Sequence, residues 1–256
     1  MIEGVEWPSV QRAAMSGARE WMTRILSALA GISLLCASAA DARSAKPKRP
    51  PTGARKAVPA PRTVPDITPS AAALRVADWI ATSGDNQTLP YAIVDKTNAA
   101  LFLYDADGNP LAQVPVLIGI APGDDATPGV GTKDLSELGP AEKTTPAGRF
   151  LAKFGLAAGG VKVLWVDYAD SVAMHPIPSD AAKSEKRRDR MLSATPGDNR
   201  ITFGCINVPL AFYGKILRPL FLGQGGYVYV LPDTKPLEDV FPRLRVHALT
   251  YDRAAS

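Results

Sequence analysis

The residues best suited to covalent chemistry in this sequence are its scarce cysteines and histidines. Among 256 residues there are two of each: Cys36, Cys205, His175 and His247. A cysteine attacks as its thiolate and needs a nearby base or cation to form it at neutral pH. In the stretch RITFGCINVP, Gly204 precedes Cys205 and permits a tight turn whose N–H groups can converge on an oxyanion. We therefore expect Cys205 to be a nucleophile, whereas a buried inert cysteine is the alternative that the count alone allows.

The two histidines differ in their surroundings. His175 follows the predicted strand VLWVDYA closely, where a side chain can emerge at a sheet edge. His247 lies in a weakly patterned basic segment near the C-terminus, and we expect it to be structural or exposed. Pro209 can open a helix, which would place Cys205 just upstream of a helix N-terminus that favours the thiolate.

The elements that must position these residues are mainly strands. Ser70 can cap a helix over 71–83 that ends at Gly84. Strand patterns then follow over 91–97, over a hairpin at 99–119, and over 149–156, 161–169 and 225–233. Residues 121–148 have a loop composition, and further helices are expected at 179–193 and 210–221. The short strands predict a mainly β fold with a sandwich or barrel-like core and a few peripheral helices.

The N-terminal part has the pattern of an export signal. Arg24 precedes an apolar run of about 15 residues, and Ala40-Asp41-Ala42 forms an A-x-A cleavage site. The true start is then Met15 or Met22, and cleavage falls near Ala39–Ala42. An uncleaved membrane anchor is the alternative, but the run is shorter than the roughly 20 residues that span a bilayer. Removal of the signal also removes Cys36, which leaves Cys205 as an unpaired thiol in an exported protein.

The segment after the signal is a predicted tether. Residues 43–69 are rich in proline and basic residues and cannot bury enough apolar surface to fold. Contact with anionic cell-envelope polymers is one role for it, and a solvated spacer is the other. The predicted organisation is a signal at 1–42, a linker at 43–69, a helix leading into the domain at 70–89, a catalytic domain at 90–235 and a C-terminal extension at 236–256.

The charge distribution argues against a nucleic-acid partner. The net charge is +4, but residues 41–70 alone carry seven Lys and Arg against two Asp. The rest of the chain is nearly neutral, whereas a nucleic-acid-binding domain needs a basic face.

Four segments in sequence resemble the L,D-transpeptidase (YkuD-type) family. TFGCINV is similar to the family's block of Ser or Thr, His, Gly, Cys, an apolar residue and Asn or Arg. TTPAGRF at 144–150 is similar to its Thr-Pro-x-Gly-x-Phe segment. The early ALFLYD hairpin and the closing GGYVYVLP resemble the family's first and last strands. The resemblance covers roughly residues 90–232.

The resemblance implies a reaction on peptidoglycan stem peptides in the cell envelope or periplasm. Cys205 would attack the carbonyl before a terminal D-alanine and form a thioester, which an amine acceptor resolves into a cross-link. His175 would be the general base, and Gly204 and Cys205 would offer N–H groups to the oxyanion. Thr202 and Asn207 would lie against the substrate, although Asn207 could instead tie down the turn. No metal or organic cofactor is implied.

The sequence departs from the family pattern at three places. Phe203 replaces the usual histidine, and we expect it to reshape the pocket wall without abolishing activity, because its backbone N–H is retained. Pro176 follows the base where glycine or serine is common, but its carbonyl can still hold the second ring nitrogen. The gap from His175 to Thr202 is longer than usual, and the surplus coincides with the basic segment 183–190. That segment is either a lid over the cleft or a solvated helix face.

Two other functions stay open at this point. The same nucleophile could hand its thioester to water, which would make the protein a peptidoglycan carboxypeptidase or endopeptidase. A catalytically silent cell-wall-binding module, with Phe203 as the disabling change, is the second alternative. Donor and acceptor peptides and the oligomeric state do not follow from the sequence.

Overall fold

The computed structural model describes residues 67–246. The predicted signal segment, nearly all of the predicted tether, Cys36 and His247 lie outside these residues. Within 67–246, none of the helices has both the length and the apolar composition needed to cross a membrane.

The described chain contains ten strands and, with both ends inside residues 67–246, five α-helices. The strands are β1 (Tyr91–Asp95), β2 (Ala100–Tyr104), β3 (Pro110–Pro115), β4 (Ile118–Gly119), β5 (Gly148–Leu156), β6 (Lys162–Asp167), β7 (Val172–Pro176), β8 (Arg200–Thr202), β9 (Ile206–Val208) and β10 (Gly226–Val230). The helices are α2 (Ala71–Ser83), α3 (Arg187–Met191), α4 (Leu210–Phe212), α5 (Arg218–Phe221) and α6 (Leu237–Val240). A π-helical segment, Tyr213–Leu217, joins α4 to α5.

Eight strands form one sheet in the order β3-β2-β1-β10-β5-β6-β7-β9. The pairs β1–β10 and β7–β9 are parallel, and the other neighbours are antiparallel. A bridge joins Leu117, just after β3, to Asn207 in β9, so the two ends of the sheet meet. The short β4 and β8 form a separate parallel pair. The predicted mainly β, barrel-like fold class is therefore confirmed.

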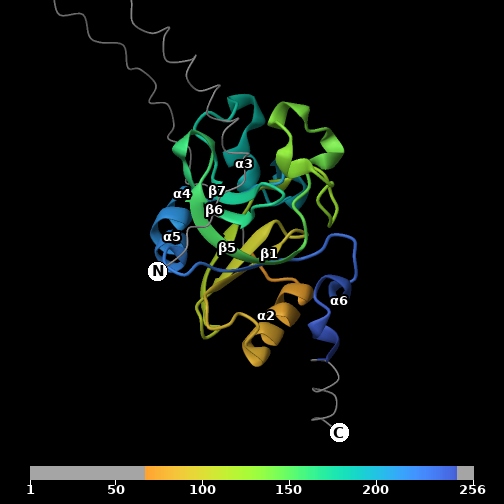
Figure 1. Cartoon of the computed structure of the whole chain (residues 1–256), viewed down its shortest axis with the longest axis vertical. Coiled ribbons are helices and arrows are strands. Elements are labelled where there is room, and N and C mark those ends of the chain that lie inside the picture. Colours follow the sequence, from red (N-terminus) through yellow and green to blue (C-terminus); the bar gives the residue numbers. More distant parts are fainter. Residues whose placement is uncertain (1–66, 247–256) are drawn as a thin grey trace, which may run out of the picture. The chain divides into compact units, whose positions relative to one another are not determined.

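Two apolar cores lie on opposite faces of the sheet. On β1, Ala92 and Val94 belong to one core, and Tyr91 and Ile93 belong to the other, as the alternation of side chains along a strand requires. The first core also holds the apolar side of the α4–α5 segment, and the second is covered by α2 and α6. Figure 1 shows α2 and α6 below the strands, and α3 above them.

The first helix begins and ends where the sequence predicts. The Ser70 hydroxyl accepts a hydrogen bond from Ala73 N at 3.1 Å, and Gly84 ends the helix in a left-handed conformation with φ of 65°. Trp79 and Ile80 are buried against the sheet, whereas Leu74 is exposed.

Three local expectations are wrong. The helix predicted at 179–193 shrinks to a 3₁₀ turn at Lys183–Glu185 and the five residues of α3, because Lys186 between them adopts a left-handed conformation. His175 does not emerge after a strand but lies inside β7. Cys205 is not just upstream of a helix N-terminus, because β9 separates it from α4.

Residues outside the predicted catalytic domain also pack in its second core. Ile67, at the end of the predicted tether, lies against this core. Phe241 and Leu244 of the predicted C-terminal extension are buried in it. The core is therefore built from more of the chain than residues 90–235.

Candidate active site

The predicted base lies in β7, and the predicted nucleophile stands directly before its parallel neighbour β9. His175 is the register partner of Asn207, and Met174 is the partner of Ile206. Met174 and Ile206 point into the first core. Because side chains alternate along a strand, His175 and Asn207 lie on the other face. Cys205 stands directly before β9, two residues before Asn207.

The Cys205 thiol is held by the turn between β6 and β7. The Ala173 N–H donates to Sγ at 3.5 Å, and Sγ lies 3.7 Å from the carbonyl oxygen of Ser171, to which the thiol donates. Burial raises the pKa of Cys205, although the Ala173 N–H and the charge of Arg187 oppose this rise. The resting group is therefore a neutral thiol at neutral pH, not a preformed thiolate.

The His175 ring is fixed by the carbonyl expected to orient it. Nδ1 lies 2.8 Å from the carbonyl oxygen of Pro176. A carbonyl oxygen only accepts, so Nδ1 carries the hydrogen and Nε2 keeps a lone pair. Burial lowers the pKa of His175, and the charge of Arg187 lowers it further, whereas the bond to Pro176 acts in the opposite direction. His175 is thus a neutral acceptor, while the thiol's hydrogen bonds go to Ser171 and Ala173.

The turn before Cys205 requires a glycine. Gly204 has φ of +120°, and a Cβ at this position would lie 2.7 Å from the carbonyl oxygen of Thr144. Thr145 Oγ1 donates to the Gly204 carbonyl at 2.7 Å. Thr145, the first residue of the Thr145–Phe150 segment of the sequence motif, therefore connects the 121–148 loop to the turn before Cys205.

Thr202 is built into the same turn. Its side chain is only 2% exposed, and its hydroxyl donates to the Cys205 carbonyl at 2.6 Å and accepts from the Gly204 N–H at 3.3 Å. The resemblance assigns Thr202 to the substrate and the Gly204 N–H to the oxyanion. In this structure both groups are bonded to each other within the turn.

Phe203 lies at the surface beside the turn. Its side chain is 38% exposed, and Lys143 Nζ is 3.9 Å from the centre of its ring. This distance is typical of a cation–π contact. Phe203 therefore does not pack under the turn but faces the 121–148 loop, where it can form part of a cleft wall.

Arg187 joins the site and was not predicted individually. Its Nη1 donates to Asn207 Oδ1 at 3.0 Å, and its Nε donates to Glu185 Oε2 at 2.7 Å. The Arg187 side chain is 12% exposed, whereas Arg188 beside it is exposed. The sequence singled out the segment 183–190, but nothing in its charge pattern shows that Arg187 reaches Asn207 while Arg188 stays exposed.

A buried lysine anchors the loop that supports the turn, and sequence reasoning missed it as well. Lys96 Nζ donates to the carbonyl oxygens of Gly123 at 2.6 Å and Thr145 at 3.0 Å, and pairs with Asp124 at 3.0 Å. Asp124 in turn accepts several bonds from residues 233–235. A lysine directly after an apolar strand gives no sign in the sequence that it is buried.

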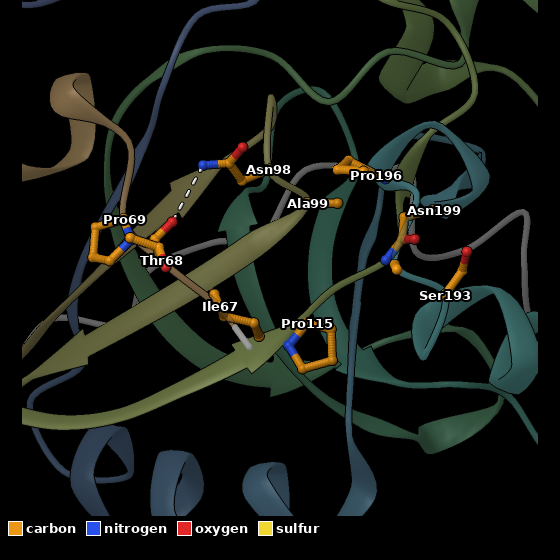
Figure 2. A pocket seen from close by; sticks show the side chains of 10 residues that line it. Ile67, Thr68, Pro69, Asn98, Ala99, Pro115, Ser193, Pro196 and Asn199 are labelled. Atoms are coloured by element: carbon orange, nitrogen blue, oxygen red, sulfur yellow. Dashed lines mark hydrogen bonds between the residues drawn. The ribbon is translucent and has the colours of Figure 1, made fainter. Parts of the chain in front are cut away.

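A pocket of about 380 Å³ lies apart from these residues (Figure 2). It is bounded by Asn98 at the β1–β2 turn, by Pro115, and by Ser193 and Asn199 after α3. Its lining includes neither Cys205 nor His175. Within residues 67–246, no cluster of three or more His, Cys, Asp and Glu side chains is placed to hold a metal ion.

Comparison with known proteins finds similarity in structure only. No protein-family model and no curated protein matches the chain. The similar solved structures include an L,D-transpeptidase from Xylanimonas cellulosilytica (14% identity, TM-score 0.36), a mutant of the helical cell shape determining protein Pgp2 from Campylobacter jejuni (14%, 0.39), and the catalytic domain of the E. faecium L,D-transpeptidase (19%, 0.31).

The matches cover 56%, 65% and 56% of this chain. The chain spans 60% and 58% of the first two structures and 96% of the third. At these identities and TM-scores the likeness says nothing about activity. The structural neighbours nevertheless include L,D-transpeptidase domains, the family that the sequence motifs resemble.

Proposed function

We propose that this protein is an exported peptidoglycan L,D-transpeptidase with Cys205 as nucleophile and His175 as general base. The observations that support the proposal are the contact of the Cys205 thiol with Ala173 of β7 and the position of His175 two residues further along the same strand, with its ring fixed through Pro176. The resemblance of the TFGCINV and TTPAGRF segments to this family supplies the substrate class.

The resting protonation states favour a base-assisted attack. His175 Nε2 accepts the thiol proton as Sγ bonds to the stem-peptide carbonyl carbon, and the carbonyl oxygen becomes an oxyanion. The C–N bond to the terminal D-alanine then breaks, its nitrogen takes the proton from His175, and a thioester remains. An amine from a second stem attacks this thioester, loses its proton to His175, and expels the Cys205 thiolate, which is reprotonated. The net change exchanges one amide bond for another.

Two alternatives follow from the same site. Water in place of the amine acceptor would make the protein a carboxypeptidase or endopeptidase. A cell-wall-binding module without activity would leave the thiol unreacted. The predicted export, the tether's contact with an anionic envelope and the stem-peptide partners belong to the proposal as well.

Acylation by a carbapenem-type β-lactam tests the nucleophile. We expect intact-mass analysis to find one adduct on the wild type, none on Cys205→Ser, and a rate lower by orders of magnitude on His175→Ala. Phe203→Ala serves as the matched neighbour and should keep measurable acylation. A wild type that stays unlabelled, while folded by circular dichroism, would overturn the proposal. Incubation with a stem tetrapeptide, with and without an amine acceptor, then separates cross-linked from hydrolysed products.

A further inference from the structure

One positive charge lies inside the candidate site with part of its hydrogen-bonding capacity unused. Arg187 donates through Nε to Glu185 and through Nη1 to Asn207. Its third nitrogen, Nη2, donates to no residue between 67 and 246. A guanidinium has five N–H groups in a planar fork that fits a carboxylate. Arg187 therefore keeps donors free for an anion.

The neighbouring amide also has an unused donor. Asn207 is fully buried, and its Oδ1 is bonded to Arg187. Its Nδ2 has no hydrogen-bond partner among the described residues. A buried N–H group without a partner costs about 1–3 kcal/mol, so the site gains when an acceptor reaches it. Arg187 and Asn207 thus both have free N–H donors that a single anion could accept from.

The segment that carries Arg187 is held in place. Arg190 Nε donates to the Glu185 carbonyl at 3.0 Å, and its Nη1 donates to the Asp198 carbonyl at 3.2 Å. Met191 at the end of α3 is buried. The guanidinium therefore stands at a fixed place, as recognition of a small anion requires.

The position of Arg187 relative to the dyad indicates which part of a substrate it meets. Cys205 Sγ lies beside Ala173. His175 and Asn207 stand two residues further along the paired strands, which corresponds to about 6–7 Å. Arg187 is bonded to Asn207 and so lies on the His175 side of the thiol. The amine that leaves after thiol attack takes its proton from His175, and therefore departs on this side.

We propose that Arg187, with Asn207, recognises the terminal carboxylate of the amino acid that leaves the acyl donor. This inference rests on the proposed function. In a terminal D-alanine only one carbon separates the departing nitrogen from the carboxylate. The pair would therefore select stems with a free C-terminus over internal bonds, which makes Arg187 a specificity-determining residue. Because the Glu185 carboxylate already accepts from Arg187 Nε, only the two Nη nitrogens of the guanidinium can donate to a substrate.

Two donor peptides that differ in one group test the proposal. One is a stem tetrapeptide that ends in D-alanine, and the other is the same peptide ending in D-alaninamide. A hydrogen bond to a charged group contributes about 1.5–3 kcal/mol, which corresponds to a preference of about tenfold to a hundredfold in kcat/KM for the carboxylate. We expect the wild type to show this preference, and Arg187→Met to lose it by slowing the acid donor but not the amide.

Arg188→Met is the matched control, because it removes the same charge from the same helix at an exposed position. It should keep the wild-type ratio of kcat/KM for the acid donor to kcat/KM for the amide donor, and Arg187→Lys should keep part of this preference. Because the ratio is measured within each protein, partial unfolding of a variant does not alter it. A wild type that uses both donors equally, or an Arg187→Met variant that slows both equally, overturns the inference and leaves the transpeptidase intact. A wild type that turns over neither donor and is not acylated at Cys205 overturns the proposed function itself.

Discussion

Replacement of Gly204 by alanine is expected to destabilise the protein markedly through two separate effects, backbone strain and a steric clash. The residue has φ of +120°, a conformation that L side chains rarely adopt, and the new Cβ would lie 2.7 Å from the carbonyl oxygen of Thr144. That oxygen belongs to the backbone of a segment fixed on both sides. Ala121 bridges to Thr144, and Thr145 is bonded to the Gly204 carbonyl. The clash therefore cannot be relieved by a side-chain rotation.

The two effects can be added for a first estimate of the cost. Backbone strain contributes about 1–3 kcal/mol, and overpacking against a fixed group contributes about 1–3 kcal/mol. The expected loss is therefore about 2–6 kcal/mol from a total stability of about 5–15 kcal/mol. For a domain of this size each kcal/mol lowers Tm by about 2–4 °C, so the melting temperature should fall by about 4–24 °C.

Gly214→Ala is the matched control. It lies in the helical stretch between α4 and α5, its φ is not positive, and no atom lies within 4 Å of the added Cβ. Alanine is favoured over glycine in a helix by about 0.5–1 kcal/mol, so this variant should melt at or slightly above the wild-type temperature. Thermal unfolding followed by circular dichroism compares the three proteins. A Gly204→Ala variant that melts within about 2 °C of the wild type would refute the argument from φ and Thr144.

Three further outcomes follow from the same contacts. Burial raises the pKa of Cys205 above the ordinary thiol value of 9.0. The rate at which iodoacetamide labels the native protein, measured by intact mass, should therefore keep rising with pH in the range where the rate for the protein unfolded in urea has levelled off. Lys96→Met leaves Asp124 and Asp233 without their buried cation and should cost about 3–5 kcal/mol in urea denaturation, whereas a loss below about 1 kcal/mol would contradict a buried ion pair. Thr145→Val removes a hydroxyl bonded on both sides and should cost about 1–3 kcal/mol by the same measurement.

The parts of the fold that could be predicted from the sequence are those with local signals. The helix at 71–83 has a capping serine, a terminal glycine and an apolar side, and the structure reproduces its bounds. The strands around 91–104 read as continuous apolar runs because both faces of the sheet are covered. The short strands β8 and β9 have only three residues each. No periodic pattern can show in so few positions, and their pairing depends on residues far away in the chain.

In the candidate site, too, some residues could be predicted from local sequence signals and others could not. Cys205, Gly204 and His175 could be singled out because their residue types are rare or conformationally distinctive. The role of Thr202 in the turn and the inward position of Arg187 depend on tertiary contacts with Cys205 and Asn207. A hydroxyl or a guanidinium in the sequence gives no indication of which partner it will meet.

The electrostatics of the site argue that Arg187 serves the substrate more than the nucleophile. Its charge lowers the pKa of Cys205, which favours the thiolate, and it also lowers the pKa of His175, which disfavours the imidazolium. Proton transfer from thiol to imidazole creates both ions together, so these two effects of Arg187 oppose each other in that step. A bound carboxylate would join Glu185 on the guanidinium and weaken both effects together. A carboxylate bound to Arg187 therefore shifts the pKa of Cys205 and the pKa of His175 in the same direction, whereas a cation beside the thiol alone would act only on the thiolate.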